Sequence, residues 1–232
     1  MNWESFWNRF PQQFDRDDFA RQVLYTIGGK PISDVEIMHF SEKARAILKL
    51  DKKDAVLDLC CGNGLITQRI AEHCQRVVGV DFSATLIERA KSFKARDNII
   101  YECDDALRFL CRPETVEANF DKLLMHGALQ YFQPKDFPRL VSGIKAALAR
   151  DGMAFIGGVP DRAKKGIFFN TTRRKLLHIW HRLRGTDRIG TWWDRDYVQR
   201  ISSEHGMSCT FFDDGSQFST SYRFDVLLEH RR

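Results

Sequence analysis

Residues 56–67 read Val-Leu-Asp-Leu-Cys-Cys-Gly-Asn-Gly-Leu-Ile-Thr, and the rest of the chain is arranged around this stretch. The apolar run at residues 55–59 predicts a buried parallel strand, and residues 65–74 predict a helix. Gly62 and Gly64 between them allow a tight turn and a close approach of a ligand to the backbone. The stretch therefore predicts a strand, a glycine-rich loop and a helix start that faces a ligand. Two glycines alone are equally typical of an ordinary strand-to-helix turn.

Asp81 is a second candidate ligand-binding residue. It stands seventeen positions after Gly64 and directly follows a second buried-strand pattern at residues 76–80. An acidic residue at the end of the second strand, roughly 20 residues after a glycine turn, is placed to accept hydrogen bonds from the two hydroxyls of a ribose. This half of the chain is therefore expected to bind a nucleoside.

The loop distinguishes between two classes of nucleoside ligand. A dinucleotide-binding loop needs Gly or Ala five residues after its first glycine, but Thr67 stands there after Gly62. Asp58 lies four residues before Gly62, where a carboxylate would repel a pyrophosphate and favour a cation. S-adenosylmethionine carries an ammonium and a sulfonium and no phosphate, so the charge of the loop favours it.

These stretches resemble the class I S-adenosylmethionine-dependent methyltransferases over about residues 51–159. The family's loop pattern, acidic-x-Gly-x-Gly-x-Gly, is matched by Asp58, Gly62 and Gly64, with Cys60 in place of the first glycine. The resemblance implies S-adenosylmethionine as cofactor and S-adenosylhomocysteine as product. It also implies further cofactor contacts, with Asp105 the closer match for the group that meets the adenine amine. These further residues are Asn63, Asp81, Phe82, Asp104, Asp105 and Ala106.

The fourth strand pattern, residues 120–125, places His126 at the sheet edge where ligands bind in open α/β folds. The resemblance implies that the loop after this strand faces the reacting methyl group. Methyl transfer is an in-line displacement that depends on holding the acceptor, and a hydroxyl acceptor benefits from a base. His126 is our candidate for that base or for orienting the acceptor, and a loop histidine bound to backbone is the alternative. Gln130 and Tyr131 are candidate substrate contacts.

The first 50 residues predict a helical lid. An aromatic stripe with helical spacing ends at Pro11 and is expected to pack on the body of the protein or, as a second interpretation, to cover the active site. Ser33 and Glu36 have capping-box spacing before a helix that runs to about Leu50. The family resemblance implies that such a leading segment closes over the cofactor, which makes Tyr25 a candidate cofactor contact, with core packing as the alternative. The stripe consists of Trp3, Phe6, Trp7 and Phe10.

The order of the patterns predicts one α/β domain over residues 1–232, with a Rossmann-like, doubly wound sheet. The seven strands are expected to be mostly parallel, with an antiparallel C-terminal strand implied by the family resemblance. Four parts follow in order: the lid at 1–50, a cofactor-binding core at 51–159, a basic helical cap at 160–200 and a strand pair at 201–232.

The cap is the basic part of a chain with net charge +5, because residues 160–200 hold eleven Lys and Arg against four Asp. Residues 173–184 predict a helix with one apolar and one basic face. The basic face is expected to be solvated, to bind an anion over the substrate, or to lie on an acidic membrane surface. Candidate substrate contacts in the cap are His178, His181, Trp192 and Trp193, the tryptophans being equally suited to a core.

The composition bears on whether the protein is globular, membrane-spanning, secreted or metal-binding. An apolar content of 43% and a charged content of 29% are typical of a globular protein. No stretch approaches the roughly 18 apolar residues of a membrane span, and the first residues lack the pattern of a secretory signal, so we expect a cytoplasmic protein. Six cysteines without Cys-x-x-Cys spacing predict reduced thiols and no metal site.

The favoured function is O-methylation of a small polar, anionic metabolite or sugar-type acceptor. Methylation of a quinone precursor or lipid-like acceptor, with membrane contact through the basic helix, is an alternative. A non-catalytic binding protein that keeps the fold is another. Nucleic acid is not expected as a substrate, because no Asn-Pro-Pro-Tyr or similar motif follows the fourth strand. The sequence does not predict an oligomeric state.

Overall fold

The computed structural model describes residues 2–172, 189–213 and 221–231, together with Leu176, Trp180 and Arg184. Its main sheet has seven strands in the order β5-β4-β3-β6-β7-β9-β8, in which only β9 runs against its neighbours. The predicted sheet is therefore confirmed. The strands are β3 (Ala55–Leu59), β4 (Arg76–Asp81), β5 (Ile99–Cys103), β6 (Phe120–His126), β7 (Leu148–Pro160), β8 (Met207–Phe212) and β9 (Arg223–His230).

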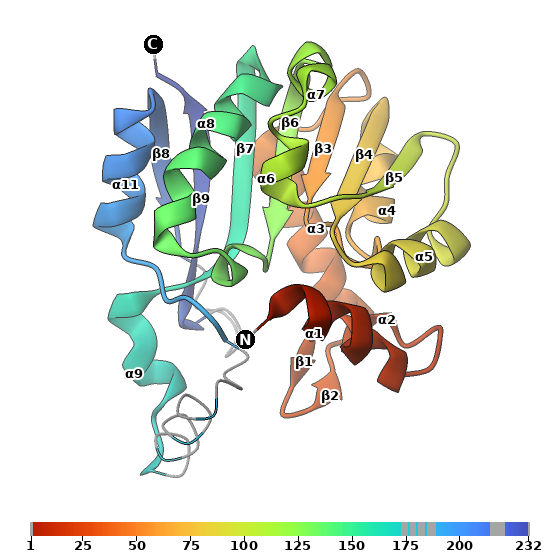
Figure 1. Cartoon of the computed structure of the whole chain (residues 1–232), viewed down its shortest axis with the longest axis vertical. Coiled ribbons are helices and arrows are strands. Elements are labelled where there is room, and N and C mark those ends of the chain that lie inside the picture. Colours follow the sequence, from red (N-terminus) through yellow and green to blue (C-terminus); the bar gives the residue numbers. More distant parts are fainter. Residues whose placement is uncertain are drawn as a thin grey trace.

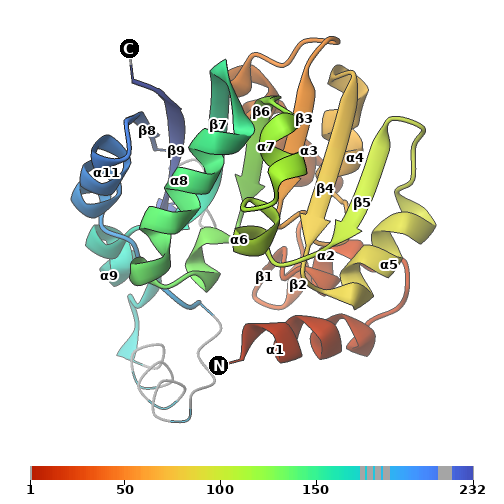
Figure 2. The same cartoon turned by 45° about the horizontal axis from the view of Figure 1, so that its top comes forward.

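Helices cover both faces of the sheet (Figures 1 and 2). One face carries α6 (Ala106–Phe109), α7 (Pro113–Glu117), α8 (Phe137–Ala147) and α11 (Arg195–Glu204). The other carries α3 (Asp34–Leu48), α4 (Thr67–Ile70) and α5 (Ala84–Phe93). Within the described ranges, no helix combines the length and apolar character needed to span a bilayer.

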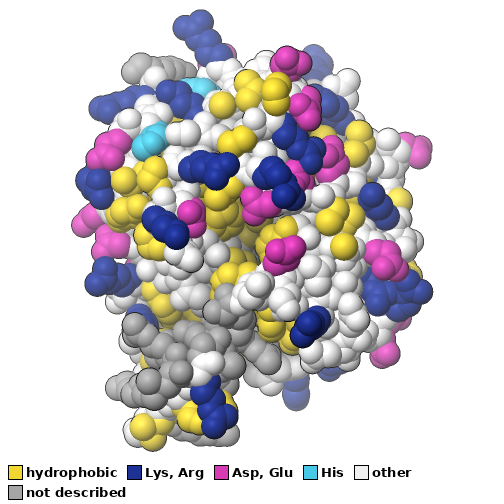
Figure 3. Space-filling view, in the orientation of Figure 1, with side chains coloured by type: hydrophobic (Ala, Val, Ile, Leu, Met, Phe, Trp, Pro, Cys, Tyr) yellow, Lys and Arg dark blue, Asp and Glu magenta, His cyan; other side chains and the backbone are white. Residues whose placement is uncertain are grey.

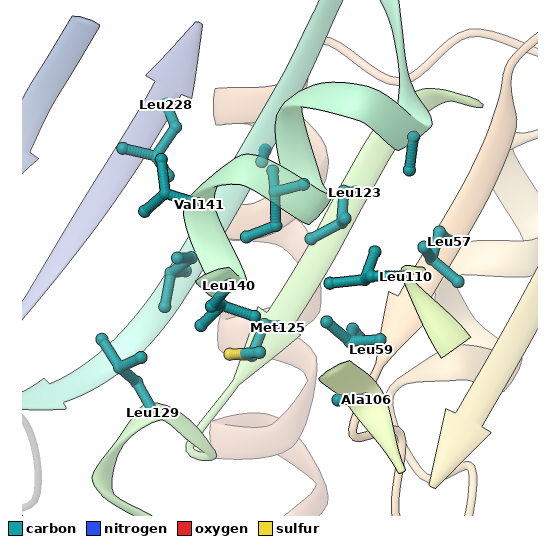
Figure 4. Close-up of a cluster of buried hydrophobic side chains, with 14 of the residues drawn as sticks. Leu57, Leu59, Ala106, Leu110, Leu123, Met125, Leu129, Leu140, Val141 and Leu228 are labelled. Atoms are coloured by element: carbon teal, nitrogen blue, oxygen red, sulfur yellow. The ribbon is translucent and has the colours of Figure 1, made fainter. Parts of the chain in front are cut away.

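The central strand β3 is buried on both faces, as its apolar sequence predicts. All five of its residues are buried, because helices pack on both sides of it. Leu57 and Leu59 face α6 and α8, where Figure 4 shows them beside Leu110, Leu123 and Met125. Only Asp58 interrupts this apolar strand, and a buried carboxylate in such a place needs a functional or hydrogen-bonding reason.

The N-terminal segment lies across the carboxyl ends of β3 to β6 (Figure 2). It contains α1 (Trp3–Arg9), a 3₁₀ turn (Phe10–Gln13), α2 (Phe19–Gln22) and a hairpin of β1 (Thr26–Ile27) and β2 (Lys30–Pro31) that the sequence did not predict. The hydroxyl of Ser83 donates to the carbonyl of Trp7 at 2.8 Å, and that of Thr85 donates to the carbonyl of Asn8 at 2.9 Å. The start of α5 therefore holds α1 on the body of the protein.

Several helix boundaries differ from the predictions. The helix expected at 65–74 is α4 followed by a 3₁₀ turn (Ala71–His73), because the chain must return at once to pair β4 with β3. α8 ends at Ala147, since Leu148 already pairs with Phe120 as the start of β7. The predicted basic helix at 173–184 lies almost wholly outside the described residues. The capping box at the start of α3 is confirmed, as the Ser33 N–H donates to the Glu36 carboxylate at 2.7 Å.

Gly64 shows how tightly the glycine loop is packed. Its φ is +75°, and a Cβ there would lie 2.9 Å from Cζ of Tyr101, closer still to the Tyr101 hydroxyl, and 3.2 Å from Cβ of Ala90. Tyr101 is buried, and its hydroxyl donates to the carbonyl of Lys94 at 3.2 Å, so the ring has little room to retreat. Gly64 therefore serves the packing of the loop against α5 and β5.

We expect Gly64→Ala to lower the free energy of unfolding by about 2 to 4 kcal/mol, since backbone strain adds to overpacking. Gly29→Ala is the matched control, because Gly29 has φ +81° but nothing within 4 Å of a new Cβ. The control should lose only about 1 to 2 kcal/mol. Urea unfolding measures both, and equal losses would show that the Tyr101 contact is without consequence.

Candidate functional site

Two adjoining cavities open at the carboxyl ends of the strands. The outer cavity, of about 600 Å³, is lined by the loop after β3 and by the ends of β4, β5 and β6. The inner cavity, of about 180 Å³, lies between α3, β7 and β9. The two share a wall, which consists of Val23, Tyr25, His126, Gly127 and Tyr131. The two cavities therefore meet at these residues.

The outer cavity gathers most of the residues that the sequence assigned to the cofactor. Gly62 and Gly64 are exceptions, because they shape the loop and do not line the cavity. Cys60, in place of the family's first glycine, adopts φ +61°, so the backbone there takes a left-handed conformation despite its side chain. The lining residues assigned from the sequence are Tyr25, Asp58, Cys60, Asn63, Asp81, Phe82, Asp104, Asp105 and Ala106.

Asp81 joins the loop to the next helix. One carboxylate oxygen accepts the N–H of Gly62 at 3.0 Å, and the other accepts the N–H of Ser83 at 2.8 Å. Burial raises the pKa of Asp81 to about 6, although the two backbone hydrogen bonds oppose this rise. A carboxylate has about four lone-pair sites, so acceptor capacity remains for the hydroxyls of a ligand.

Asp58 lies beneath the loop and is only 3% exposed. The hydroxyl of Thr67 donates to it at 2.6 Å, which accounts for Thr67 at a position where a dinucleotide-binding loop would have a small residue. Burial raises the pKa of Asp58 to about 7, with a further contribution from the charge of Asp81. A cation bound beside Asp58 would restore its charged form, so this region favours a positively charged ligand.

Asp104 and Asp105 have different roles. Asp104 is buried and forms ion pairs with Arg108 and Arg112. Burial opposes ionisation of Asp104, but these arginines and the N–H of Asp105 together lower its pKa. Asp105 caps α6 by accepting the N–H of Arg108 at 3.0 Å, and it is exposed at the cavity. Asp105 is therefore the carboxylate with a face left for a ligand.

The N-terminal segment completes the outer cavity. Trp3 and Trp7 line it, and their rings contact Tyr131 at centroid distances of 4.6 and 5.4 Å. The aromatic stripe thus packs on the body and forms one wall of the cavity at the same time. The amide of Asn63 donates to the carbonyl of Phe19 at 2.9 Å and to the side chain of Gln22 at 3.1 Å, which ties the loop to α2.

His126 stands in the shared wall. Its Nδ1 lies 2.8 Å from the hydroxyl of Tyr25, and its ring packs against Phe40 at a centroid distance of 5.0 Å. Burial lowers the pKa of His126 to about 4, so the imidazole is neutral at neutral pH. Burial also raises the pKa of Tyr25 well above its usual range, so the phenol keeps its proton. Tyr25 therefore holds His126, besides lining both cavities.

The inner cavity has aromatic walls and a polar end. Lys43 on α3 forms an ion pair with Asp225 on β9 at 2.7 Å, and Asp225 also accepts the N–H of Gly158 at 2.7 Å. The side chain of Arg223 donates to Gln130 at 2.8 Å and to the carbonyl of Gly158. The sequence predicted Gln130 but missed the three charged residues, of which Lys43 lies on α3 and the other two on β9. The aromatic walls are formed by Phe40, Phe155, Tyr222 and Phe224.

The tryptophan pair of the cap region lies outside both cavities. Trp193 is 1% exposed, packs against Phe137, and donates its Nε1 to the carbonyl of Leu129 at 3.1 Å. It is a core residue, so the prediction of a substrate contact is wrong for it. Trp192 stacks near Tyr222 at a centroid distance of 5.9 Å, one ring away from the inner cavity. His178 and His181 lie outside the described residues.

Several of the basic side chains described in the cap region form ion pairs. Arg195 binds Asp161 at 2.8 Å and Asp213 at 2.6 Å, and Lys164 also binds Asp213. Across the described ranges, no group of three or more His, Cys, Asp or Glu side chains is arranged to hold a metal ion. These ion pairs join the segments that follow β7 and β8 to the start of α11.

Comparison with known proteins agrees with the geometry. Residues 56–152 match the model of a methyltransferase domain. An uncharacterised methyltransferase of Schizosaccharomyces pombe is 30% identical over 107 residues, covering 45% of this chain and 40% of that protein. A 23S rRNA (uracil(1939)-C(5))-methyltransferase of Xanthomonas oryzae is 37% identical over 155 residues, covering 62% of this chain and 34% of that protein. The chain thus spans little more than a third of the length of these relatives.

Solved structures share the whole fold. A SAM-dependent methyltransferase from Anabaena variabilis superposes with a TM-score of 0.67 at 16% identity, covering 100% of this chain and 96% of that one. The mostly parallel sheet with an antiparallel C-terminal strand, expected from the sequence, therefore agrees with this shared architecture. Residues 56–152 are thus similar to a methyltransferase domain, and the fold around them is the one seen in S-adenosylmethionine-dependent methyltransferases.

Proposed function

We propose that this chain transfers the methyl group of S-adenosylmethionine to an oxygen of a small acceptor held in the inner cavity. The observation that carries the proposal is the shared wall, in which Tyr25, His126 and Tyr131 line both cavities. Methyl transfer needs donor and acceptor in line and in contact. Two cavities that meet at these residues bring donor and acceptor next to each other.

The outer cavity suits the cofactor in size and charge. Its volume of about 600 Å³ lies within the usual range for cofactor sites. Asp81 would accept the ribose hydroxyls, Asp105 would accept the adenine amine, and Asp58 would favour the positive charge of the methionine part. When bound, S-adenosylmethionine supplies an electrophilic methyl group.

His126 is placed to orient the acceptor hydroxyl. Nε2 can accept a hydrogen bond from the hydroxyl of the substrate only if Nδ1 carries the ring proton. Nδ1 then donates a hydrogen bond to the oxygen of Tyr25. A pKa of about 4 makes full protonation of the buried ring costly, so orientation is a larger part of its role than proton removal. Tyr25 is then a positioning residue that fixes the tautomer of His126.

Nucleic acid is a second candidate acceptor, because some relatives are named as rRNA methyltransferases. The face shown in Figure 3 carries acidic side chains among its Lys and Arg side chains, which favours the small-molecule alternative for the described part of the chain. The rate of RNA methylation should fall steeply between low and physiological salt, because binding to RNA weakens. The rate with a small acceptor in an enclosed cavity should change little.

Calorimetric titration with S-adenosylmethionine, S-adenosylhomocysteine and NAD tests the proposal first. We expect the first two to bind and NAD not to bind, because a pyrophosphate would meet Asp58. Transfer of tritium from labelled S-adenosylmethionine to a panel of hydroxylated small molecules, with a structured RNA beside them, then identifies the acceptor class. Binding of NAD alone would overturn the cofactor assignment, and transfer to the RNA alone would favour the second candidate.

Asp81→Asn should weaken S-adenosylmethionine binding by about 1.5 to 3 kcal/mol, because charged hydrogen bonds to the ribose are lost. The matched control is Asp121→Asn. The carboxylate of Asp121 accepts the N–H of Ala55 at 2.8 Å, at the opposite end of β3 and away from the outer cavity. This control should affect stability but leave affinity unchanged. Equal affinity of Asp81→Asn and the wild type would place the ribose elsewhere.

Affinity for S-adenosylmethionine should rise with pH from about 5 to about 8. The pKa of Asp58 is raised to about 7 and that of Asp81 to about 6, so a cationic ligand must displace protons at lower pH. Titration in two buffers of different ionisation enthalpy should show proton release near pH 6.5. Asp58→Asn, which keeps an acceptor for Thr67, should flatten the pH dependence, and an unchanged slope would exclude Asp58 as its source.

The free energy of unfolding without ligand should change in the opposite sense for these carboxyls. Their folded pKa values exceed the unfolded value of 3.8, so their contribution is full below about pH 4 and is lost as pH rises through 6 and 7. His126 acts oppositely, since its lowered pKa costs stability as pH falls from 6.5 towards 4. Because of these opposed effects, the ligand-binding slope is the clearer measurement.

His126→Ala should lower turnover on the order of 10²-fold, because the acceptor is no longer held in line, while cofactor affinity stays within about twofold. Tyr25→Phe should lower turnover less and shift its pH profile, because the tautomer of His126 is no longer fixed. Steady-state rates with the acceptor from the tritium screen, together with S-adenosylhomocysteine titration, measure both effects. Full turnover of His126→Ala would remove the ring from the mechanism.

A further inference from the structure

The polar end of the inner cavity is formed by side chains that hydrogen-bond to the backbone of β7. Gly157 and Gly158 of β7 form an irregularity opposite β9, where the register shifts between Ile156 and Val159. Gly158 has φ +70°, and its N–H and carbonyl bind Asp225 and Arg223 respectively. Two side chains of β9 thus hold the bulge open at the cavity.

Arg223 is fixed in place by several contacts. Nη1 donates to the side-chain oxygen of Gln130 and to the carbonyl of Gly158, and the guanidinium lies 5.0 Å from the ring centroid of Tyr222. These contacts account for both hydrogens of Nη1. Among the described residues, no hydrogen-bond or ion-pair partner is found for Nε and Nη2, although Arg223 lines the inner cavity. A guanidinium edge with parallel N–H donors matches the two oxygens of a carboxylate.

The charge of the cavity favours a single negative charge on its ligand. Lys43 and Arg223 are cationic, and Asp225 is the one acidic side chain among the described residues that line the inner cavity. The ion pair of Lys43 with Asp225 uses one positive charge, so the remaining balance is +1 at Arg223. A monoanion suits this balance better than a dianionic phosphate does.

The same end of the cavity adjoins the reacting position. A Cβ on Gly158 would lie 3.6 Å from Nε2 of His126, while the carbonyl of Gly158 accepts from Arg223. His126 and Arg223 therefore both lie close to Gly158. A molecule whose hydroxyl reaches His126 can place an anion at Arg223 only if the two groups are a few bonds apart.

We propose that Arg223 binds a carboxylate of the methyl acceptor, so that the acceptor is a small hydroxylated carboxylic acid with an apolar or aromatic body. This inference rests on the proposed function, because it names the acceptor class of that site. The aromatic walls of the inner cavity would cover the body of the acid. The expectation of an anionic acceptor came from residues 160–200, whereas the cation that serves it here lies on β9.

Binding of benzoate and of benzamide, its neutral counterpart, tests this inference without turnover. With S-adenosylhomocysteine bound, the wild type should bind benzoate about ten- to a hundredfold more tightly than benzamide, since a charged hydrogen-bonded pair is gained. Phenyl phosphate should bind no more tightly than benzoate. Equal binding of benzoate and benzamide, no binding of benzoate, or a preference for phenyl phosphate would overturn the carboxylate assignment.

Two variants locate the effect at Arg223. Arg223→Gln should remove the preference for benzoate while benzamide binding stays the same. Gln130→Glu keeps the arginine but places a carboxylate against Nη1, so it should also weaken benzoate binding by neutralising the cation. Arg200→Gln, on the exposed face of α11 where Arg200 pairs with Glu204, is the control and should retain the preference. A preference that persists in Arg223→Gln would overturn the proposal.

The same titrations distinguish failure of the proposed function from failure of the acceptor class. Failure of S-adenosylhomocysteine to bind the wild type would overturn the proposed function itself. Normal S-adenosylhomocysteine binding without a preference for benzoate would overturn only the acceptor class. Unchanged S-adenosylhomocysteine affinity in Arg223→Gln and Gln130→Glu shows that both variants fold, so that a lost preference reports on the inner cavity.

Discussion

The carboxylate of Asp81 is the interaction on which the site depends. It accepts one N–H from the glycine loop and one from the start of α5, so a single buried group fixes the ends of two neighbouring strands. The hydroxyl of Ser83 in turn holds α1 over the cavity through the carbonyl of Trp7. The loop, the helix and the N-terminal segment are thus placed by a short chain of hydrogen bonds from one side chain, and the outer cavity has its shape because of them.

The inner cavity has a separate origin, in an irregularity of the sheet. Position 157 of the bulged strand has no room for a side chain, since a Cβ on Gly157 would nearly touch the imidazole of His126. The two glycines allow the strand to bulge, and Asp225 and Arg223 bind the backbone groups that the bulge leaves unpaired. The polar residues that stabilise the bulge also line the space it creates. Structure and ligand recognition therefore depend on the same side chains.

Sequence patterns predicted what is local and missed what is assembled from distant segments. β3, its glycine loop and Asp81 lie within about 30 residues and carry the periodicity and spacing of a nucleoside-binding unit. Lys43 and Asp225 meet only in the folded chain, and no local pattern marks such a pair. The adjacent tryptophans show a further limit: successive side chains of an extended segment point to opposite sides, so Trp193 enters the core while Trp192 lies beside Tyr222.

The electrostatics of the two cavities complement each other. Burial makes ionisation costly for Asp58 and Asp81 in the outer cavity and for His126 in the wall, so without ligands these groups tend towards their neutral forms. A cation in the outer cavity favours the ionised carboxylates, and an anion in the inner cavity compensates Arg223. Each ligand thus offsets an electrostatic cost that the folded chain carries when the cavity of that ligand is empty. A cationic methyl donor and an anionic acceptor would also attract each other across the wall, which favours their juxtaposition before transfer.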